Sequence, residues 1–209
     1  MRRRPRAGAA VPGFRTTPAP TTQKPQQQPT GLGLKAPNEF NLLGNNPQNE
    51  ITLQKAALGS GLRGPELAQF LGQMKHESWN FERLKEQPKG QDYFERRYGV
   101  KHAPKTASIL GNKYPGDGER YHGRGYVQLT GRENYRRAGE ALGIDLLNQP
   151  DLAAKPDIAA KIAMWYWNSR VKPRVKNFAD TAAVTKTINP ALRGLEDRDA
   201  NFKDYMRLV

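Results

Sequence analysis

Two glutamates stand nine residues apart around the expected end of a helix. At about 100° per residue, Glu77 lies about 20° from Phe70 around the helix axis, at the edge of an apolar stripe. Glu86 follows after Trp79 and Asn80, where the helix is expected to end. Two carboxyl groups facing one cleft suit glycosidic hydrolysis, in which one protonates the leaving oxygen and the other activates water or attacks carbon. The alternative is that Glu77 pairs with a Lys or Arg at the rim of the core.

Other site chemistries find little support in the composition. The chain has 209 residues and no cysteine, which excludes disulfides, thiol catalysis and Cys-ligated metals. Its three histidines, His76, His102 and His122, are too scattered to indicate a metal centre. No apolar run approaches the roughly 20 residues of a membrane helix, so no transmembrane segment is expected. The composition therefore indicates no metal centre.

The charge is strongly positive, with 34 Lys and Arg against 20 Asp and Glu and a net charge of +14. Such a charge favours anionic partners, among them nucleic acid, phospholipid head groups and acidic cell-wall polymers. Charge alone does not choose among these partners.

Composition divides the chain into an arm and a domain. Eight of the 16 prolines fall in the first 50 residues, mixed with Thr, Gln and Arg. We therefore predict a disordered basic Pro/Gln-rich arm over residues 1–36, either a solvated tether or a docking segment. We expect residues 37–48 to form a linker or docking segment with a short apolar patch, and residues 49–209 to form the domain that carries the candidate catalytic residues. The stretch after Arg6 is too short and broken for the core of a signal peptide, so no Sec signal is expected.

The domain is expected to be mainly α-helical, with one small β-hairpin. Asn49 is a plausible N-cap for the first helix, and Thr130 with Glu133 forms a plausible capping box for a later one. Glycines followed by apolar residues over 121–129 indicate a loop leading into a short strand or hairpin. Helices are expected over 49–58, from 65 to about 78, and over 92–98, 105–110, 130–142, from 156 onwards, 180–188 and 195–208.

Two stretches carry a more specific signal. Residues 75–81 read Lys-His-Glu-Ser-Trp-Asn-Phe, followed by Leu-Lys-Glu at 84–86. Residues 121–135 read Tyr-His-Gly-Arg-Gly-Tyr-Val-Gln-Leu-Thr-Gly-Arg-Glu-Asn-Tyr. Together they resemble glycoside hydrolase family nineteen in its short phage and bacterial form, over about residues 50–209. The resemblance implies a lysozyme-like, two-lobed helical fold around a sugar-binding cleft.

The resemblance also assigns roles to individual residues. Glu77 matches the general acid, Glu86 the general base, and Thr130 the hydroxyl that helps the base position water. The matched substrate-binding set is His76, Tyr126, Gln128, Asn134, Asn189 and Arg198. Amide side chains suit the N-acetyl and hydroxyl groups of amino sugars. His76 and Arg198 match positions that orient cleft residues or the sugar, although Arg198 could instead only neutralise Glu77 or Glu86.

The resemblance implies inverting hydrolysis of β-1,4 bonds between amino sugars, a reaction for which we expect neither a metal nor a cofactor. Peptidoglycan is the expected polymer, because a basic enzyme suits the anionic bacterial wall, with chitin as the alternative. We expect synthesis in a host cytoplasm and arrival at the wall by lysis or as a virion component. A tail or capsid protein is the possible partner of the arm. The rival hypothesis is a virion-structural or nucleic-acid-binding protein with an inactive domain, but no nucleic-acid recognition element is visible in the sequence.

Overall fold

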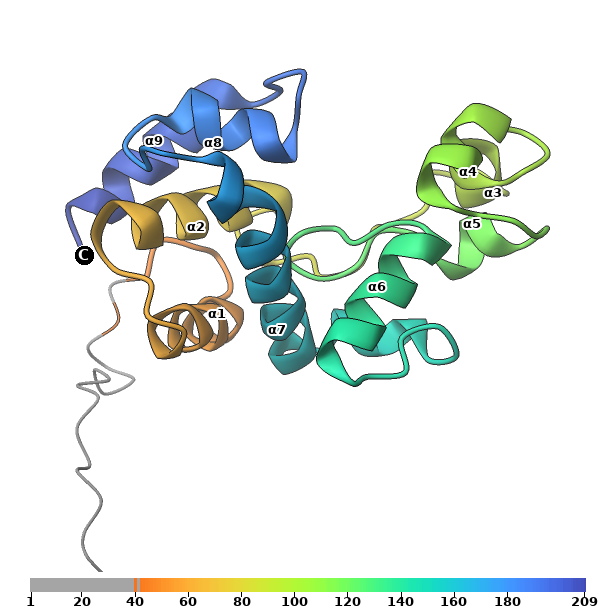
Figure 1. The fold of residues 1–209 in the computed structure, drawn as a ribbon, viewed down its shortest axis with the longest axis horizontal. Coiled ribbons are helices and arrows are strands. Elements are labelled where there is room, and N and C mark those ends of the chain that lie inside the picture. Colours follow the sequence, from red (N-terminus) through yellow and green to blue (C-terminus); the bar gives the residue numbers. More distant parts are fainter. Residues whose placement is uncertain (1–39, 41) are drawn as a thin grey trace, which may run out of the picture. The chain divides into compact units, whose positions relative to one another are not determined.

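The computed structural model describes Phe40 and residues 42–209 (Figure 1). The predicted arm over residues 1–36 lies outside this part of the chain, as do residues 37–39 and 41 of the predicted linker. Within the described part, no helix combines the length and apolarity needed to cross a membrane.

The described residues are mainly helical, which confirms the predicted fold class. The α-helices are α1 (Pro47–Gly59), α2 (Gly64–Glu77), α3 (Tyr93–Tyr98), α4 (Pro104–Leu110), α5 (Asp117–Arg120), α6 (Arg132–Leu142), α7 (Pro156–Tyr166), α8 (Thr181–Ile188) and α9 (Leu195–Met206). Short 3₁₀ helices span Pro150–Ala154 and Lys172–Arg174, and a π-helical turn spans Trp167–Val171. Pro at the first or second position of several of these helices fits the missing N–H of proline.

The expected hairpin is smaller than the sequence indicated. Arg124 and Leu129 form one isolated antiparallel bridge, with backbone hydrogen bonds of 3.1 and 2.8 Å, and Lys85 bridges to Arg124. Between the paired residues, Gly125 and Gln128 have positive φ angles of 75° and 47°. Because these residues turn the backbone out of the extended region, the pairing cannot continue into a strand.

Two hydrophobic clusters form the core. The first combines apolar residues of α1, α2, α7 and α9, and α2 packs along α9 (Figure 1). The second gathers Tyr121, Leu129, Tyr135, Ala138, Leu146, Ala153 and Ile162. Helix α7 contributes to both clusters, with Ala163 in the first and Ile162 in the second. The helical domain is therefore built as two lobes that share α7, while α3 packs against α4 and α5.

Phe70 offers a direct test of this core. Its ring is fully buried and meets the ring of Trp167 edge-on, at 5.2 Å between centroids. We expect Phe70→Ala to lower the free energy of unfolding by about 3–5 kcal/mol, since the lost burial leaves a cavity. Ile109→Ala, at a side chain 85% exposed on α4, should change it by less than about 0.5 kcal/mol. Urea denaturation of both variants measures the difference, and equal losses would contradict this assignment of the core.

Two predicted helix caps are wrong. Asn46, rather than Asn49, caps α1, because its side chain accepts the backbone N–H of Asn49 at 3.1 Å. The Asn49 side chain instead donates to the carbonyl of Phe81 at 2.8 Å. The capping box is absent as well: Thr130 donates to the carbonyl of Gln128, and α6 starts at Arg132, with Gly131 as an N-cap residue that has no side chain to form a cap.

The described part of the expected linker lies against the domain. Phe40 is 8% exposed, and Leu43 packs on the first core cluster. The fully buried carboxylate of Glu50 accepts the backbone N–H groups of Leu43 and Gly44 and the hydroxyl of Tyr205. These bonds give a buried charge the partners that it requires. At these positions the apolar patch therefore caps the domain.

Candidate active site

One cleft of about 730 Å³ contains most of the predicted site residues. Its walls come from the end of α2, the segment after it, α3, the turn before α6 and the start of α9. The lining residues include the predicted site residues His76, Glu77, Glu86, Gln128 and Thr130. The two glutamates therefore open onto one space, as the sequence analysis expected for the acid and the base.

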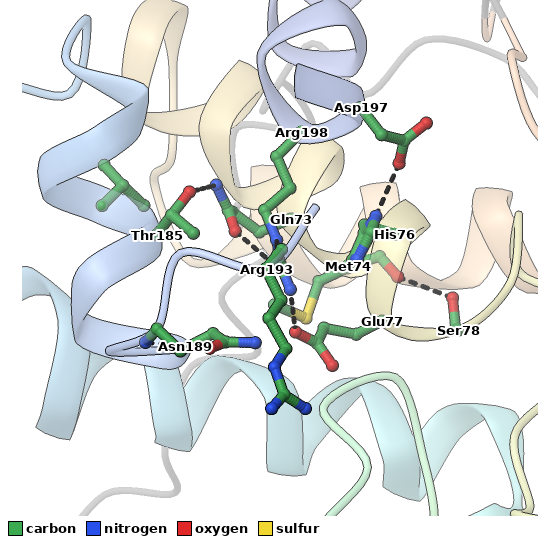
Figure 2. Close-up of polar contacts among 12 residues, drawn as sticks. Gln73, Met74, His76, Glu77, Ser78, Thr185, Asn189, Arg193, Asp197 and Arg198 are labelled. Atoms are coloured by element: carbon green, nitrogen blue, oxygen red, sulfur yellow. Dashed lines mark hydrogen bonds and ion pairs between the residues drawn. The ribbon is translucent and has the colours of Figure 1, made fainter. Parts of the chain in front are cut away.

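Glu77 ends α2 and is held by a buried arginine (Figure 2). The Arg198 guanidinium, 1% exposed, donates to Glu77 Oε1 at 2.5 Å and to Gln73 Oε1 at 2.6 Å. It also donates to the carbonyl of Arg193 at 3.2 Å. Gln73 is fixed in turn by donating to Thr185 Oγ1 at 3.0 Å. A buried guanidinium is stable only when its N–H groups have hydrogen-bond acceptors, and Arg198 uses one oxygen of Glu77 as such an acceptor. The network therefore fixes the position of that carboxylate oxygen.

His76 lies beside Glu77 and is oriented by α9. Its Nδ1 lies 2.6 Å from Asp197 Oδ2, and both side chains line the cleft (Figure 2). Gly194, with φ of 71°, passes directly under the imidazole, where a Cβ atom would lie 2.2 Å from His76 Cε1. Any larger residue at 194 would therefore displace the histidine ring.

An unusual turn follows the predicted acid. Trp79, Asn80 and Phe81 have φ angles of 54°, 57° and 65°, although left-handed backbone is unfavourable for residues with a Cβ. Backbone bonds from Asn80 N to the Lys75 carbonyl and from Asn45 N to the Asn80 carbonyl, both 2.9 Å, offset this strain. The turn buries Phe81 completely and leaves Trp79 60% exposed in the cleft wall.

Glu86 is held by neutral donors instead of a cation. The Tyr98 hydroxyl donates to both carboxylate oxygens at 3.1 Å, and the Gly123 N–H donates to Oε2 at 3.2 Å. Burial and the negative charge of Glu86 raise the pKa of Tyr98 to about 12. The Tyr98 hydroxyl therefore keeps its proton at neutral pH and donates a hydrogen bond to Glu86.

The backbone at Gly123 lies close to both Glu86 and Gln128, and a side chain at this position would separate them. Glu86 N donates to the Gly123 carbonyl at 2.9 Å, and a Cβ at position 123 would lie 2.7 Å from Gln128 Oε1. Gln128 Nε2 donates to the Gly125 carbonyl at 3.0 Å, and Thr130 Oγ1 donates to the Gln128 carbonyl at 2.8 Å. The Thr130 hydroxyl oxygen therefore keeps acceptor capacity toward the cleft, as positioning a water requires.

The other predicted substrate-binding residues lie elsewhere. Tyr126 is fully buried in the first core cluster, and its hydroxyl donates to the Asn49 carbonyl, so the prediction that it binds substrate is wrong. Arg198 is too buried to reach a sugar and orients Glu77 instead. Asn134 donates to the Thr130 carbonyl, accepts from Arg170, and lines a smaller pocket that shares Gln128 and Thr130 with the cleft. Asn189, at the end of α8, accepts the Ala191 N–H and is absent from the cleft wall.

Two residues that hold the site together were not predicted from the sequence. Tyr98 contacts Glu86 across 12 positions, and Gln73 contacts Arg198 across 125. Gln73 carried one usable signal, because it lies one helical turn before Glu77. Tyr98 carried none, since its contact depends on how α3 is placed beside the segment that holds Glu86.

His122, next to Gly123, predicts a pH-dependent stability. Burial lowers the pKa of His122 to about 4, from an ordinary value near 6.5. Between pH 6.5 and pH 4, His122 is therefore mostly protonated in the unfolded chain and mostly neutral in the folded chain. The free energy of unfolding consequently decreases as the pH falls through this range. From pH 7 to pH 5 we expect this histidine to remove about 2 kcal/mol from the free energy of unfolding. Urea titrations at both pH values should show a smaller drop for His122→Asn, and an equal drop would contradict the assignment.

A mainly helical two-lobed domain, with two glutamates in one cleft and a different set of partners on each, defines a glycoside hydrolase-like protein. Comparison with known families agrees with this class. The family model described as chitinase class I matches residues 55–193, more than half of the chain. The chain therefore belongs to glycoside hydrolase family 19, whose members are glycoside hydrolases, and its fold is the lysozyme-like fold of that family.

Relatives occur in plants and bacteria. The chain is 36% identical over 173 residues to endochitinase A2 of Pisum sativum, covering 66% of this chain and 49% of that protein. It is 32% identical over 159 residues to a glycosyl hydrolase family 19 domain-containing protein of Haemophilus influenzae, covering 66% and 78%. The crystal structure of chitinase C from Streptomyces griseus matches with a TM-score of 0.56 at 25% identity, covering 77% and 82%. The chain spans about half the length, or less, of the plant endochitinases that it matches.

Proposed function

We propose that this domain hydrolyses β-1,4 bonds between amino sugars by a single displacement with inversion, and that peptidoglycan is its polymer. The observation that carries the proposal is that Glu77 and Glu86 line one cleft. Glu77 protonates the bridging oxygen as it leaves. Glu86 takes a proton from the water that attacks the opposite face of the sugar, with Thr130 helping to position that water.

The two glutamates have different hydrogen-bond partners, and these partners orient each carboxyl group toward the cleft. Arg198 occupies one oxygen of Glu77 and leaves the other free for the bridging oxygen. Tyr98 and Gly123 hold Glu86 by hydrogen bonds, and within the described part of the chain no cation forms a salt bridge with it. In an inverting enzyme the carboxyl groups stand roughly 6.5–9.5 Å apart to make room for water.

Charge favours peptidoglycan as the polymer. The net charge of +14 attracts a bacterial wall that carries phosphates and carboxylates, and this attraction weakens as salt screens it. Chitin is the second candidate, supported by the relatives named endochitinases. Both polymers offer β-1,4-linked N-acetylglucosamine to the same two glutamates.

Release of new reducing ends from purified sacculi, with chitin in parallel, tests the proposal. We expect hydrolysis of sacculi, with mass spectrometry of the products identifying the cut bond. Hydrolysis of chitin alone would favour the second candidate. Binding to nucleic acid with a steep salt dependence, and hydrolysis of neither polymer, would favour the virion-structural or nucleic-acid-binding hypothesis.

Delivery to the wall is a further part of the proposal. We infer synthesis in a host cytoplasm and release by lysis or transport within a virus particle, with residues 1–36 docking on a particle protein. The basic Pro/Gln-rich composition of that segment supports the inference. Full-length protein should associate with particles or sacculi more strongly than protein lacking residues 1–36. Equal association would contradict a docking role.

A further inference from the structure

Two arginines of the cleft wall lie over aromatic rings. The Arg83 guanidinium carbon is 4.7 Å from the centroid of the Trp79 ring. The Arg97 guanidinium carbon is 5.3 Å from the centroid of the Tyr93 ring, and Arg97 Nη1 donates to the Tyr93 hydroxyl at 2.7 Å. All four residues line the cleft. We call Trp79 with Arg83 and Tyr93 with Arg97 the arginine–aromatic pairs.

Neither arginine has a carboxylate partner in the part of the chain that the structure describes. Its ion pairs include other cations of the site, such as Lys85 with Asp151 and Arg198 with Glu77, but not Arg83 or Arg97. Both side chains are exposed. Stacking on a ring restrains a guanidinium while leaving N–H groups at its edge free to donate, so less entropy is lost when an anion binds.

The charge of the cleft wall also favours binding of an anionic group. Lys75 and Lys89 also line the cleft and, among residues 40 and 42–209, form no ion pair. Of the three lining carboxylates, Glu77 is neutralised by Arg198 and Asp197 is bound to His76. Within the described part of the chain, Glu86 is the one lining carboxylate without a salt bridge, and Tyr98 donates a hydrogen bond to it. The wall thus carries an excess of positive charge that a neutral sugar chain would not use.

We propose that the arginine–aromatic pairs bind carboxylate groups on side branches of the sugar chain. The substrate is then an amino-sugar polymer with acidic branches, such as the peptide stems of peptidoglycan, and not the unbranched neutral chain of chitin. This inference rests on the proposed function and names the groups that select its substrate. The planar guanidinium suits the task, because its parallel N–H groups can donate to both oxygens of a carboxylate.

The test compares two double variants of equal charge. Arg83→Gln/Arg97→Gln removes both guanidinium groups from the cleft. Lys55→Gln/Arg96→Gln removes two exposed cations that do not line it, and Arg96 neighbours Arg97 on the same helix. Substrates are glycan strands with intact peptide stems, purified free of teichoic acid, the same strands with carboxylates blocked as neutral amides, and chitin oligosaccharides. The readout is kcat/KM on the intact strands divided by kcat/KM on each neutral substrate, so a general effect on Glu86 cancels.

We expect the cleft variant to lower this ratio about fivefold to tenfold, because exposed charge pairs each contribute a few-fold. The effect should lie in KM, and the control variant should change the ratio by less than about twofold. An unchanged ratio in the cleft variant would overturn the inference. So would an equal loss on chitin oligosaccharides, which would mean that the pairs bind the sugar itself.

Binding measurements separate this inference from the proposed function. In a Glu77→Gln background, intact strands should bind more tightly than blocked strands, and the Arg83→Gln/Arg97→Gln substitutions should abolish the difference. If the wild type cleaves no strands but this difference is present, the proposed function fails and the inference stands. If the wild type cleaves strands but intact and blocked strands bind equally tightly, the proposed function stands and the inference fails.

Discussion

Glu77→Gln should lower the rate of hydrolysis of sacculi by about 10²- to 10⁴-fold, the contribution typical of a general acid. Glutamine keeps an oxygen that can accept from Arg198, so the buried network around it should persist. What the variant lacks is the proton for the bridging oxygen. Release of reducing ends measures the loss, and urea denaturation verifies that the free energy of unfolding is unchanged.

Glu82→Gln is the matched control for this prediction. Glu82 lies between the two cleft glutamates in sequence, is exposed, and accepts a hydrogen bond from Asn45. Its loss should leave the rate within about twofold of the wild type. Aryl glycosides whose leaving group needs no proton should also be far less sensitive to Glu77→Gln. An equal loss on sacculi and on activated aryl glycosides would contradict an acid role.

Local signals in the sequence were enough to predict the α-helices other than the four-residue α5, which was not expected. The face of α2 and the closing glycines 111 and 143 follow the 3.6-residue period and the left-handed C-cap, so both could be predicted. The caps at Asn46 and at the start of α6 could not, because several polar residues near each end could serve. The π-helical turn at Trp167–Val171 has no local signal, since ordinary helix-forming patterns run through it.

Some residues of the candidate site could be predicted from the sequence and others could not. Glu77 stood out because periodicity placed a carboxyl beside the core, and both glutamates reach the cleft. Tyr126 could not be distinguished from a cleft residue, because an aromatic beside glycines fits a binding loop and a core equally well. The structure decides by burying its ring against Phe81, at 6.2 Å between centroids. Arg83 and Arg97 were not singled out from the sequence, because their place in the cleft wall depends on the fold.

The two glutamates illustrate why sequence spacing alone could not assign roles. Glu77 lies against a buried cation, whereas Glu86 receives a phenol and a backbone N–H. Both arrangements depend on segments distant in the chain, α9 for the first and residues 98–123 for the second.

Glu86→Gln should reduce hydrolysis by about 10²- to 10⁴-fold as well, because glutamine cannot take a proton from water. Glu86→Ala should be equally slow, but it leaves space beside Tyr98 for a small anion. Azide, which needs no deprotonation, should then restore turnover and yield an α-glycosyl azide from a β-linked substrate. Glu82→Ala, the matched control, should keep the wild-type rate and respond to azide no more than the wild type does.

The anomer first formed by the wild type completes this prediction. If Glu86 activates water on the face opposite the leaving group, proton NMR should show the α-anomer before mutarotation. A β-anomer would require two displacements and a covalent intermediate, with Glu86 as the nucleophile. Azide rescue would accompany either course, since the anion replaces whichever group attacks that face. The anomer therefore decides the mechanism, and the rescue decides whether Glu86 is the residue that performs it.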